Sequence, residues 1–348
     1  MPKITDLTEF LNRGKLPDKN QVQDVFTDIM SGKVETEDLK KFLLALKDKE
    51  TPEIIAGAAS AMRDKMVKIN VRTSPDEVVL DTCGTGGGSF HTFNISTASA
   101  FVIAGCGIKV AKHGNRAVSS QFGSADVLKE LGLNLDLPPQ KAEAIIKEIG
   151  IGFLFAPLYH PAMKYAIEAR KELATRTLFN ILGPLCNPAG ADIQIVGVYE
   201  ERLSEILARA LGELGARRAF VLYSDKGLDE LSIEGKTKAV ELIDKKISLK
   251  PRKIDINYLR PQDFGVKEGT LAELAPGKNT EENAKILLDI LKGEESARID
   301  AVLINSALGI LASGITDNLK DGVGLARESI DSQKALKKLE TLITRSNK

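Results

Sequence analysis

The chain has 348 residues, of which 43% are hydrophobic and 28% charged, an ordinary composition for a soluble protein with a substantial core. Lysine plus arginine and aspartate plus glutamate both total 48, and this zero net charge argues against nucleic-acid binding, which usually needs a basic excess. Cys83, Cys106 and Cys186 lie far apart and in no CxxC pair, which argues against a disulfide framework or a zinc site. Without an apolar signal core or a bilayer-length apolar run, we expect a cytoplasmic protein with no membrane partner.

Residues 1–72 are expected to form helices only. Thr36 is a candidate N-cap for a helix that continues to Leu46. Thr51 followed by Pro52 predicts the start of another helix, since proline is favoured at the first helical position. Residues 161–183 also have helical character, and we expect them to pack back onto these helices as an inserted segment of one small helical domain.

From residue 77 onward, short β-branched runs alternate with amphipathic helices. Strands are expected at 78–80, 108–111, 193–199 and 219–223, and helices at 96–105, 124–131 and 203–214, the last ending at Gly215. This alternation predicts a large α/β domain, residues 77–160 and 184–348, with a mostly parallel central sheet and helices on both faces.

A glycine-rich stretch, GTGGGSFHTFNIST at 84–97, joins the first expected strand to a helix. Glycines let a ligand approach the backbone amides closely, and the start of the helix at Ser96 and Thr97 favours an anion. The stretch lacks the GK[ST] ending of a P-loop, and Ser89 replaces the third glycine of a dinucleotide fingerprint. It is therefore either a phosphate cradle of another type or a structural turn.

Two further loops favour the phosphate cradle. KHGNRAVSS at 112–120 also follows a strand, and Lys112 supplies a positive charge there, while Arg116 is left without an assigned role. His113, in this loop, is a candidate for substrate contact. The third loop carries Asp229 and Glu230, adjacent carboxylates of the kind that hold Mg²⁺ beside a phosphate, although a solvated acidic turn is the commoner case.

These pieces together resemble anthranilate phosphoribosyltransferase over almost the whole chain. The strings that carry the resemblance are GTGG at 84–87, FNIST at 93–97, KHGNRAVSS at 112–120, GSADVLKELG at 123–132, RTLFNILGPLCNP at 176–188, QIVGVY at 194–199 and GLDELS at 227–232. The resemblance implies a nucleoside phosphorylase-like phosphoribosyltransferase architecture and a homodimer formed through the helical domain. It also implies transfer of 5-phosphoribose from phosphoribosyl diphosphate (PRPP) to the amine of anthranilate, with Mg²⁺, in tryptophan biosynthesis.

The same resemblance implies the residues of the site. Those for PRPP are Gly84, Thr85, Gly86, Gly87, Asn94, Ser96, Thr97, Lys112, Asn115 and Ser120. Those for anthranilate are Gly84, His113, Asn115, Pro157, His160, Arg170 and Gly183. Those for the metal are Ser96, Asp229 and Glu230. An arginine suits a carboxylate because its planar fork donates two parallel hydrogen bonds.

The chemistry at an anomeric carbon and a neutral amine nucleophile needs no strong base, so no single catalytic base is assigned, with His113 as a candidate. Two alternatives remain: a nucleoside phosphorylase-like enzyme, and a non-enzymatic relative that binds nucleic acid. The sequence departs from the family at Gly88, where the family usually carries aspartate, so metal handling at this loop is left open.

Overall fold

The computed structural model describes residues 3–117, 122–243 and 253–348, and within them seven strands form one sheet in the order β3-β2-β1-β4-β5-β6-β7. The strands are β1 Val79–Gly84, β2 Lys109–Gly114, β3 Ile151–Phe155, β4 Ile193–Gly197, β5 Arg218–Ser224, β6 Thr237–Ile243 and β7 Lys253–Leu259. The first five in that order are mutually parallel, whereas β6 and β7 are antiparallel additions. The predicted α/β class with a mostly parallel sheet is confirmed.

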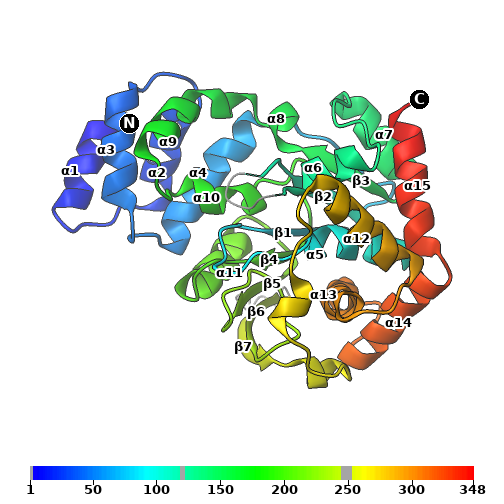
Figure 1. Cartoon of the computed structure of the whole chain (residues 1–348). Helices are drawn as coiled ribbons and strands as arrows, with labels where there is room; N and C mark the ends of the chain where they lie inside the picture. The colour runs from blue at the N-terminus through cyan, green and yellow to red at the C-terminus, as the bar shows by residue number, and fades with distance from the viewer. Residues whose placement is uncertain (1–2, 118–121, 244–252) are drawn as a thin grey trace.

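The helices cover both faces of this sheet (Figure 1). Helices of the amino-terminal half are α1 Ile4–Asn12, α2 Lys19–Ile29, α3 Thr36–Leu46, α4 Pro52–Lys65, α5 Ile95–Gly105, α6 Ser124–Glu130, α7 Pro139–Ile149, α8 Ala156–Tyr159, α9 Ile167–Leu173 and α10 Phe179–Leu182. Those that follow are α11 Arg202–Glu213, α12 Thr280–Lys292, α13 Ala297–Ser313, α14 Leu319–Asp331 and α15 Lys334–Ser346. Short 3₁₀ turns are η1 Pro161–Ala166, η2 Gly183–Leu185, η3 Pro261–Phe264 and η4 Leu271–Leu274.

Alternate side chains of the central strands face two separate cores. In β4, Ile193 and Ile195 pack with α5 and the carboxyl-terminal helices, whereas Val196 packs with α11 and the amino-terminal helices. Strand side chains point to opposite faces in turn, and the run is continuously apolar because both faces are covered. The small helical domain therefore shares its core with one face of the sheet.

The inserted segment packs on the amino-terminal helices, as Figure 1 shows for α9 beside α3. The Thr36 hydroxyl donates to Glu168 Oε2 at 2.9 Å, and Lys40 Nζ donates to Glu172 Oε2 at 2.6 Å. The predicted N-cap at Thr36 is wrong: the helix begins at Thr36 and Glu35 is the cap residue, since the hydroxyl is used between helices. The cap at Thr51 is confirmed, its Oγ1 accepting from Ile54 N at 3.3 Å.

The chain reverses its direction of winding between β1 and β4. From β1 it passes outward through α5 to β2 and then to β3, and it returns through α8 to α10 to place β4 on the other side of β1. Ligands of parallel α/β sheets bind at such a switch point, outside the carboxyl ends of the strands. Here that point is the end of β1, where the glycine-rich stretch begins.

Within the described residues, no single helix has the length and apolar character needed to cross a membrane. Helices α12 and α13 reach that length and apolar character only when they are taken together, and the pair is bent by 70° at the break between them.

Candidate active site

The glycine loop, residues 85–94 between β1 and α5, is held by the strands beside it. Gly84 belongs to β1 and pairs with Gly197 of β4, so the loop begins one residue later than the sequence indicated. Thr85 N donates to Gly197 O at 2.9 Å, and Tyr199 N donates to Thr85 Oγ1 at 3.2 Å. These bonds fix the amino-terminal end of the loop at the switch point.

An acidic loop, residues 225–232 after β5, closes against the glycine loop. Gly86 N donates to Asp229 Oδ2 at 3.0 Å and Ser89 N to Gly227 O at 3.0 Å. A Cβ placed on Gly84 would lie 2.4 Å from Asp229 Oδ2, so a larger residue there would displace this carboxylate. The structure thus brings Gly84 and Gly86 together with Asp229.

Glu230 lies against the amino-terminal end of α5. Its carboxylate accepts from Thr92 Oγ1 at 3.1 Å and from Ser96 N at 3.3 Å. Burial, and then the charge of Asp229, raise the pKa of Glu230 to about 8, and burial also raises the pKa of Asp229. Two adjacent, partly buried carboxylates of this kind are stabilised by a cation.

Mg²⁺ fits this pair on the chemistry of the oxygen donors. Among the residues that the structure describes, no three His, Cys, Asp or Glu side chains gather into a metal cluster. Mg²⁺ is commonly held by only one or two carboxylates, with substrate phosphate and water as its other ligands. Asp229, Glu230 and the hydroxyl of Ser96 are the groups that would hold it.

Lys112 and His113 lie in β2 itself rather than in the loop that the sequence indicated, because β3 pairs with them through Phe153 and Leu154. Lys112 Nζ donates to Thr82 O at 2.6 Å and lies 3.4 Å from Ser96 Oγ. Burial lowers the pKa of Lys112, and the neighbouring Asp81 opposes that shift. Lys112 is thereby placed behind the amino-terminal end of α5.

His113 and His160 form a buried pair, with 3.2 Å between their Nε2 atoms and their ring centroids 5.0 Å apart. Burial lowers the pKa of His113 to about 3, with a further contribution from His160, and lowers that of His160 to about 4. Both imidazoles are therefore neutral at pH 7. A carbonyl of Gly183 also interacts with His113, so three of the predicted anthranilate residues lie together.

Arg170 lies apart from that pair, on α9. Its guanidinium lies over the Phe179 ring, 5.7 Å from the centroid, and is half-buried, which lowers its pKa. No acidic side chain pairs with it among the described residues. A partly buried cation without an acidic partner in the described part of the chain is stabilised by a carboxylate from a ligand.

The other predicted residues hold less specific places. Asn94 Nδ2 donates to Phe122 O at 3.2 Å, and Asn115 is exposed with its Oδ1 accepting from Arg116 N. Pro157 is an exposed residue in the first turn of α8. Thr97 is buried, and its hydroxyl has no partner in the described part of the chain. Ser120 lies outside the described residues.

Sequence reasoning missed three residues that support or adjoin the site: Asp81, Asn187 and Arg176. Asp81 accepts from His113 N at 3.1 Å and from Asn187 Nδ2 at 2.8 Å, which ties β1 and β2 to the segment that precedes β4. An aspartate in the apolar run VVLD was a usable signal for Asp81. Arg176, which donates to Gly87 O, had no signal beyond its place in the string RTLFN.

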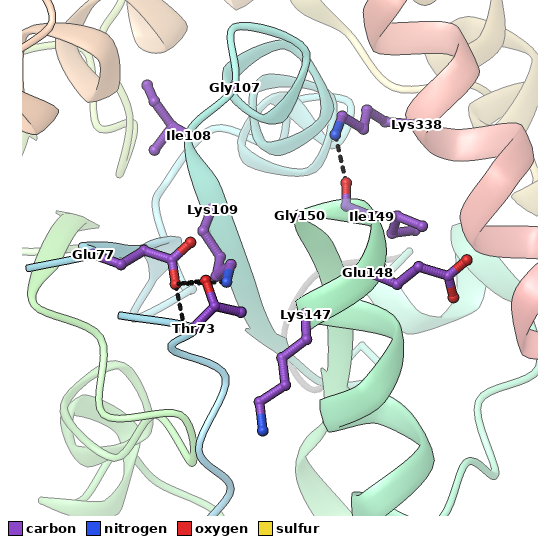
Figure 2. A pocket seen from close by; sticks show the side chains of 10 residues that line it. All are labelled: Thr73, Glu77, Gly107, Ile108, Lys109, Lys147, Glu148, Ile149, Gly150 and Lys338. Atoms are coloured by element: carbon purple, nitrogen blue, oxygen red, sulfur yellow. Dashed lines mark hydrogen bonds and ion pairs between the residues drawn. The ribbon is translucent and has the colours of Figure 1, made fainter. Parts of the chain in front are cut away.

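A separate cavity of about 240 Å³ lies at the opposite ends of the strands, where β2 and β3 begin (Figure 2). Lys109 donates to Glu77 at 2.7 Å and Lys338 to the carbonyl of Ile149, as Figure 2 shows, and Lys147 pairs with Glu143. Each of these three lysines already has an acceptor, so the cavity does not compete with the candidate site for an anion.

Two family descriptions match the chain. Residues 76–336 match the "Glycosyl transferase family, a/b domain", and residues 5–66 match the "Glycosyl transferase family, helical bundle domain".

The similar proteins and solved structures described next are all anthranilate phosphoribosyltransferases. The chain is 49% identical to an anthranilate phosphoribosyltransferase of Desulfosudis oleivorans, over 98% of each chain, and 47% identical to that of Geobacter sulfurreducens, over 93% and 94%. It superposes on the enzyme of Thermus thermophilus with a TM-score of 0.90 at 39% identity, covering 99% and 100% of the chains. The enzyme of Saccharomyces cerevisiae in complex with PRPP and Mg gives 0.85 at 30% identity, covering 99% and 98%. By fold, by the geometry of its loops and by these likenesses, the chain belongs to the anthranilate phosphoribosyltransferase family.

Proposed function

We propose that this protein transfers the 5-phosphoribosyl group of PRPP to the amine of anthranilate and releases diphosphate, with Mg²⁺. The observation that carries the proposal is the acidic loop, which places Asp229 against the glycine loop and Glu230 against the amino-terminal end of α5. The bond from the anomeric carbon to the diphosphate oxygen breaks, a carbon–nitrogen bond forms, and the amine loses a proton. Bound Mg²⁺ would neutralise charge on the leaving diphosphate.

The chain's own groups supply positioning and charge. Lys112 and the amino-terminal end of α5 favour an anion at the end of β1, as for a leaving diphosphate. The phosphate cradle is proposed to use the predicted residues Gly84, Thr85, Gly86, Gly87, Asn94, Ser96, Thr97, Lys112, Asn115 and Ser120.

On the anthranilate side, Arg170 is proposed to receive the carboxylate through its planar fork. His113, His160 and Gly183 are proposed to contact the ring, with Asn115 and Pro157 beside them. His113, with a pKa of about 3, is a weak base, which supports a mechanism without a strong general base. The amine proton is then lost after the nitrogen attacks, when it becomes acidic.

The chain is also proposed to form a homodimer through its helical domain. In support, exposed large apolar side chains occur there, Leu16 after α1 and Leu44 on α3, and also Tyr165 and Ile167 on the inserted segment. Apolar side chains on a surface that a second copy covers account for such exposure.

The proposal is tested by following loss of anthranilate fluorescence with PRPP while Mg²⁺ is titrated. The double variant Asp229→Asn, Glu230→Gln keeps the side-chain volumes but removes both charges, so we expect turnover to fall at least about a hundredfold, as for loss of a major electrostatic contribution. We also expect its Mg²⁺ dependence to change. Glu9→Gln, on the exposed face of α1, is the matched control.

Full activity of the double variant would contradict the metal assignment. Consumption of a nucleoside with inorganic phosphate, and none of anthranilate, would favour the nucleoside phosphorylase-like alternative instead.

A further inference from the structure

The backbone amides of residues 85–89, the glycine-rich first half of the glycine loop, divide into two groups. Thr85 N, Gly86 N and Ser89 N all donate to acceptors in the protein, at 2.9, 3.0 and 3.0 Å. Gly87 N and Gly88 N have no acceptor among the described residues. Because a loop amide that is engaged elsewhere cannot also bind an anion at full strength, Gly87 and Gly88 hold the amides of residues 85–89 that remain for a phosphate.

Arg176 contacts the loop at this place. It lies between α9 and α10, and its Nη2 donates to the carbonyl oxygen of Gly87. Its guanidinium also lies over the Tyr199 ring, 4.3 Å from the centroid. Tyr199 is itself joined to the loop, since its amide donates to Thr85 Oγ1. The guanidinium is thus held from two sides although the residue is exposed.

The backbone conformation of Gly87 and the space beside it suit this contact. Its φ is +81°, and a Cβ there would lie 2.7 Å from Arg176 Nη2. The left-handed backbone conformation favours glycine at this position, and a side chain there would displace the guanidinium. The contact between Arg176 and Gly87 is therefore specified by two residues and not by the arginine alone.

The consequence for the loop follows from peptide geometry. The Gly87 carbonyl and the Gly88 N–H belong to one planar trans unit and point in opposite directions. We propose that Arg176 is a positioning residue: by holding the Gly87 carbonyl it fixes the direction of the Gly88 N–H, an amide that receives the diphosphate of PRPP. This inference rests on the proposed function.

The same arginine links the two substrates. Arg170, proposed to bind the anthranilate carboxylate, lies on α9 in the same inserted segment. The segment that carries the carboxylate partner thus also holds the diphosphate loop.

The test compares Arg176→Ala and Arg176→Lys with the unchanged protein. Dissociation constants for PRPP with Mg²⁺, and for inorganic diphosphate, are measured by calorimetry, and KM for each substrate by the fluorescence assay. Arg176→Ala removes one charge-assisted hydrogen bond, so the dissociation constants for PRPP and diphosphate should rise about tenfold or more. KM for anthranilate should change less than about threefold. Lysine keeps one donor to the carbonyl, so it should restore part of the affinity.

Chemical rescue gives a readout that a structural role would not move. Arg176 borders a cavity of about 240 Å³, so added methylguanidinium can reach the vacated position and should recover PRPP binding in Arg176→Ala. The control is Arg13→Ala, at the exposed arginine that follows α1 and pairs with Glu9, and it should change neither affinity.

Unchanged diphosphate affinity in Arg176→Ala would overturn the inference, as would a fall in thermal midpoint with equal losses for both substrates. If the unchanged protein does not consume anthranilate, the proposed function fails. The ratio of diphosphate affinities between the two proteins then still decides the role of Arg176.

Discussion

Gly88 is fixed in this chain by the backbone opposite it. A Cβ on Gly88 would lie 2.6 Å from the carbonyl oxygen of Gly227 and 3.6 Å from Asp229 Oδ1. A carbonyl of the main chain cannot turn aside as a flexible side chain does. The aspartate that the family usually carries therefore has no space in this arrangement of the two loops, and it would add a third carboxylate beside Asp229.

Gly88→Asp is accordingly expected to force the acidic loop away from the glycine loop. We expect the free energy of unfolding to fall by about 1–3 kcal/mol, the usual cost of overpacking, and the Mg²⁺ optimum to shift. Urea unfolding and an Mg²⁺ titration of turnover measure the two effects. Unchanged values in both would mean that Gly88 is a simple turn residue.

Arg170 offers a second test at the residue scale. Since its guanidinium stacks on Phe179 and pairs with no acid in the described part of the chain, Arg170→Ala is expected to raise KM for anthranilate about tenfold or more, with a small effect on PRPP. Arg170→Lys should recover little, because an ammonium lacks the planar fork. Equal small changes in both KM values would refute the assignment.

At the scale of elements, α13 holds the acidic loop in place. Asn305 on α13 accepts from Leu231 N at 3.1 Å through Oδ1, and its Nδ2 donates to Leu231 O at 3.0 Å. The preceding residue, Glu230, is thereby anchored to a buried helix rather than to a free turn. Preorganisation of the carboxylate pair thus depends on a helix distant in the sequence.

Asn305→Ala leaves the buried backbone groups of Leu231 without partners. We expect about 1–3 kcal/mol less stability and a weaker apparent Mg²⁺ affinity in turnover. The matched control is Ser306→Ala on the same helix, because the buried Ser306 hydroxyl has no partner among the described residues and its loss should be neutral or stabilising. If the two variants behave alike, α13 does not position the acidic loop.

For the whole molecule, the buried histidine pair joins β2 to the segment that precedes the helical insertion. Both folded pKa values, about 3 and about 4, lie below the ordinary 6.5 of an unfolded histidine. The unfolded chain therefore binds more protons between about pH 4 and 6.5. Stability is fully present above pH 6.5 and falls as the pH decreases through that range.

At pH 5 the resulting loss in the free energy of unfolding amounts to about 2 kcal/mol for each histidine. Asp81, whose pKa burial raises to about 6, acts in the opposite direction but is common to all variants. Lowering the pH from about 7.5 to about 5 should reduce the free energy of unfolding of the unchanged protein. In the double variant His113→Asn, His160→Asn, we expect this reduction to be smaller by about 2–4 kcal/mol. Urea unfolding at the two pH values measures it, and parallel pH profiles would contradict the buried neutral pair.

Short-range sequence patterns were enough to predict part of the fold. The strand–helix alternation, the proline after Thr51 and the glycine after α11 each express a short-range preference, so four of the five parallel strands and the helices α5, α6 and α11 beside them could be predicted, whereas α7 and α12 to α15 were not. Strands β3, β6 and β7 were not predicted. β3 follows α7 directly through Gly150, and β6 and β7 take their places from antiparallel pairing with β5 rather than from a distinctive pattern of their own.

The sequence by itself determined the chemistry that this protein carries: a glycine-rich turn after a strand, a lysine after the next strand, and adjacent carboxylates after a third. Only the tertiary structure decided how these meet. The return of the chain between β1 and β4 brings Gly86 to Asp229, and the β3 pairing buries Lys112 and His113 in a strand. The physical reason is that local propensity acts over only a few residues along the chain. The contacts of Arg176 with Gly87 and of Asn305 with Leu231 join residues far apart in the sequence, so they depend on which elements pack together.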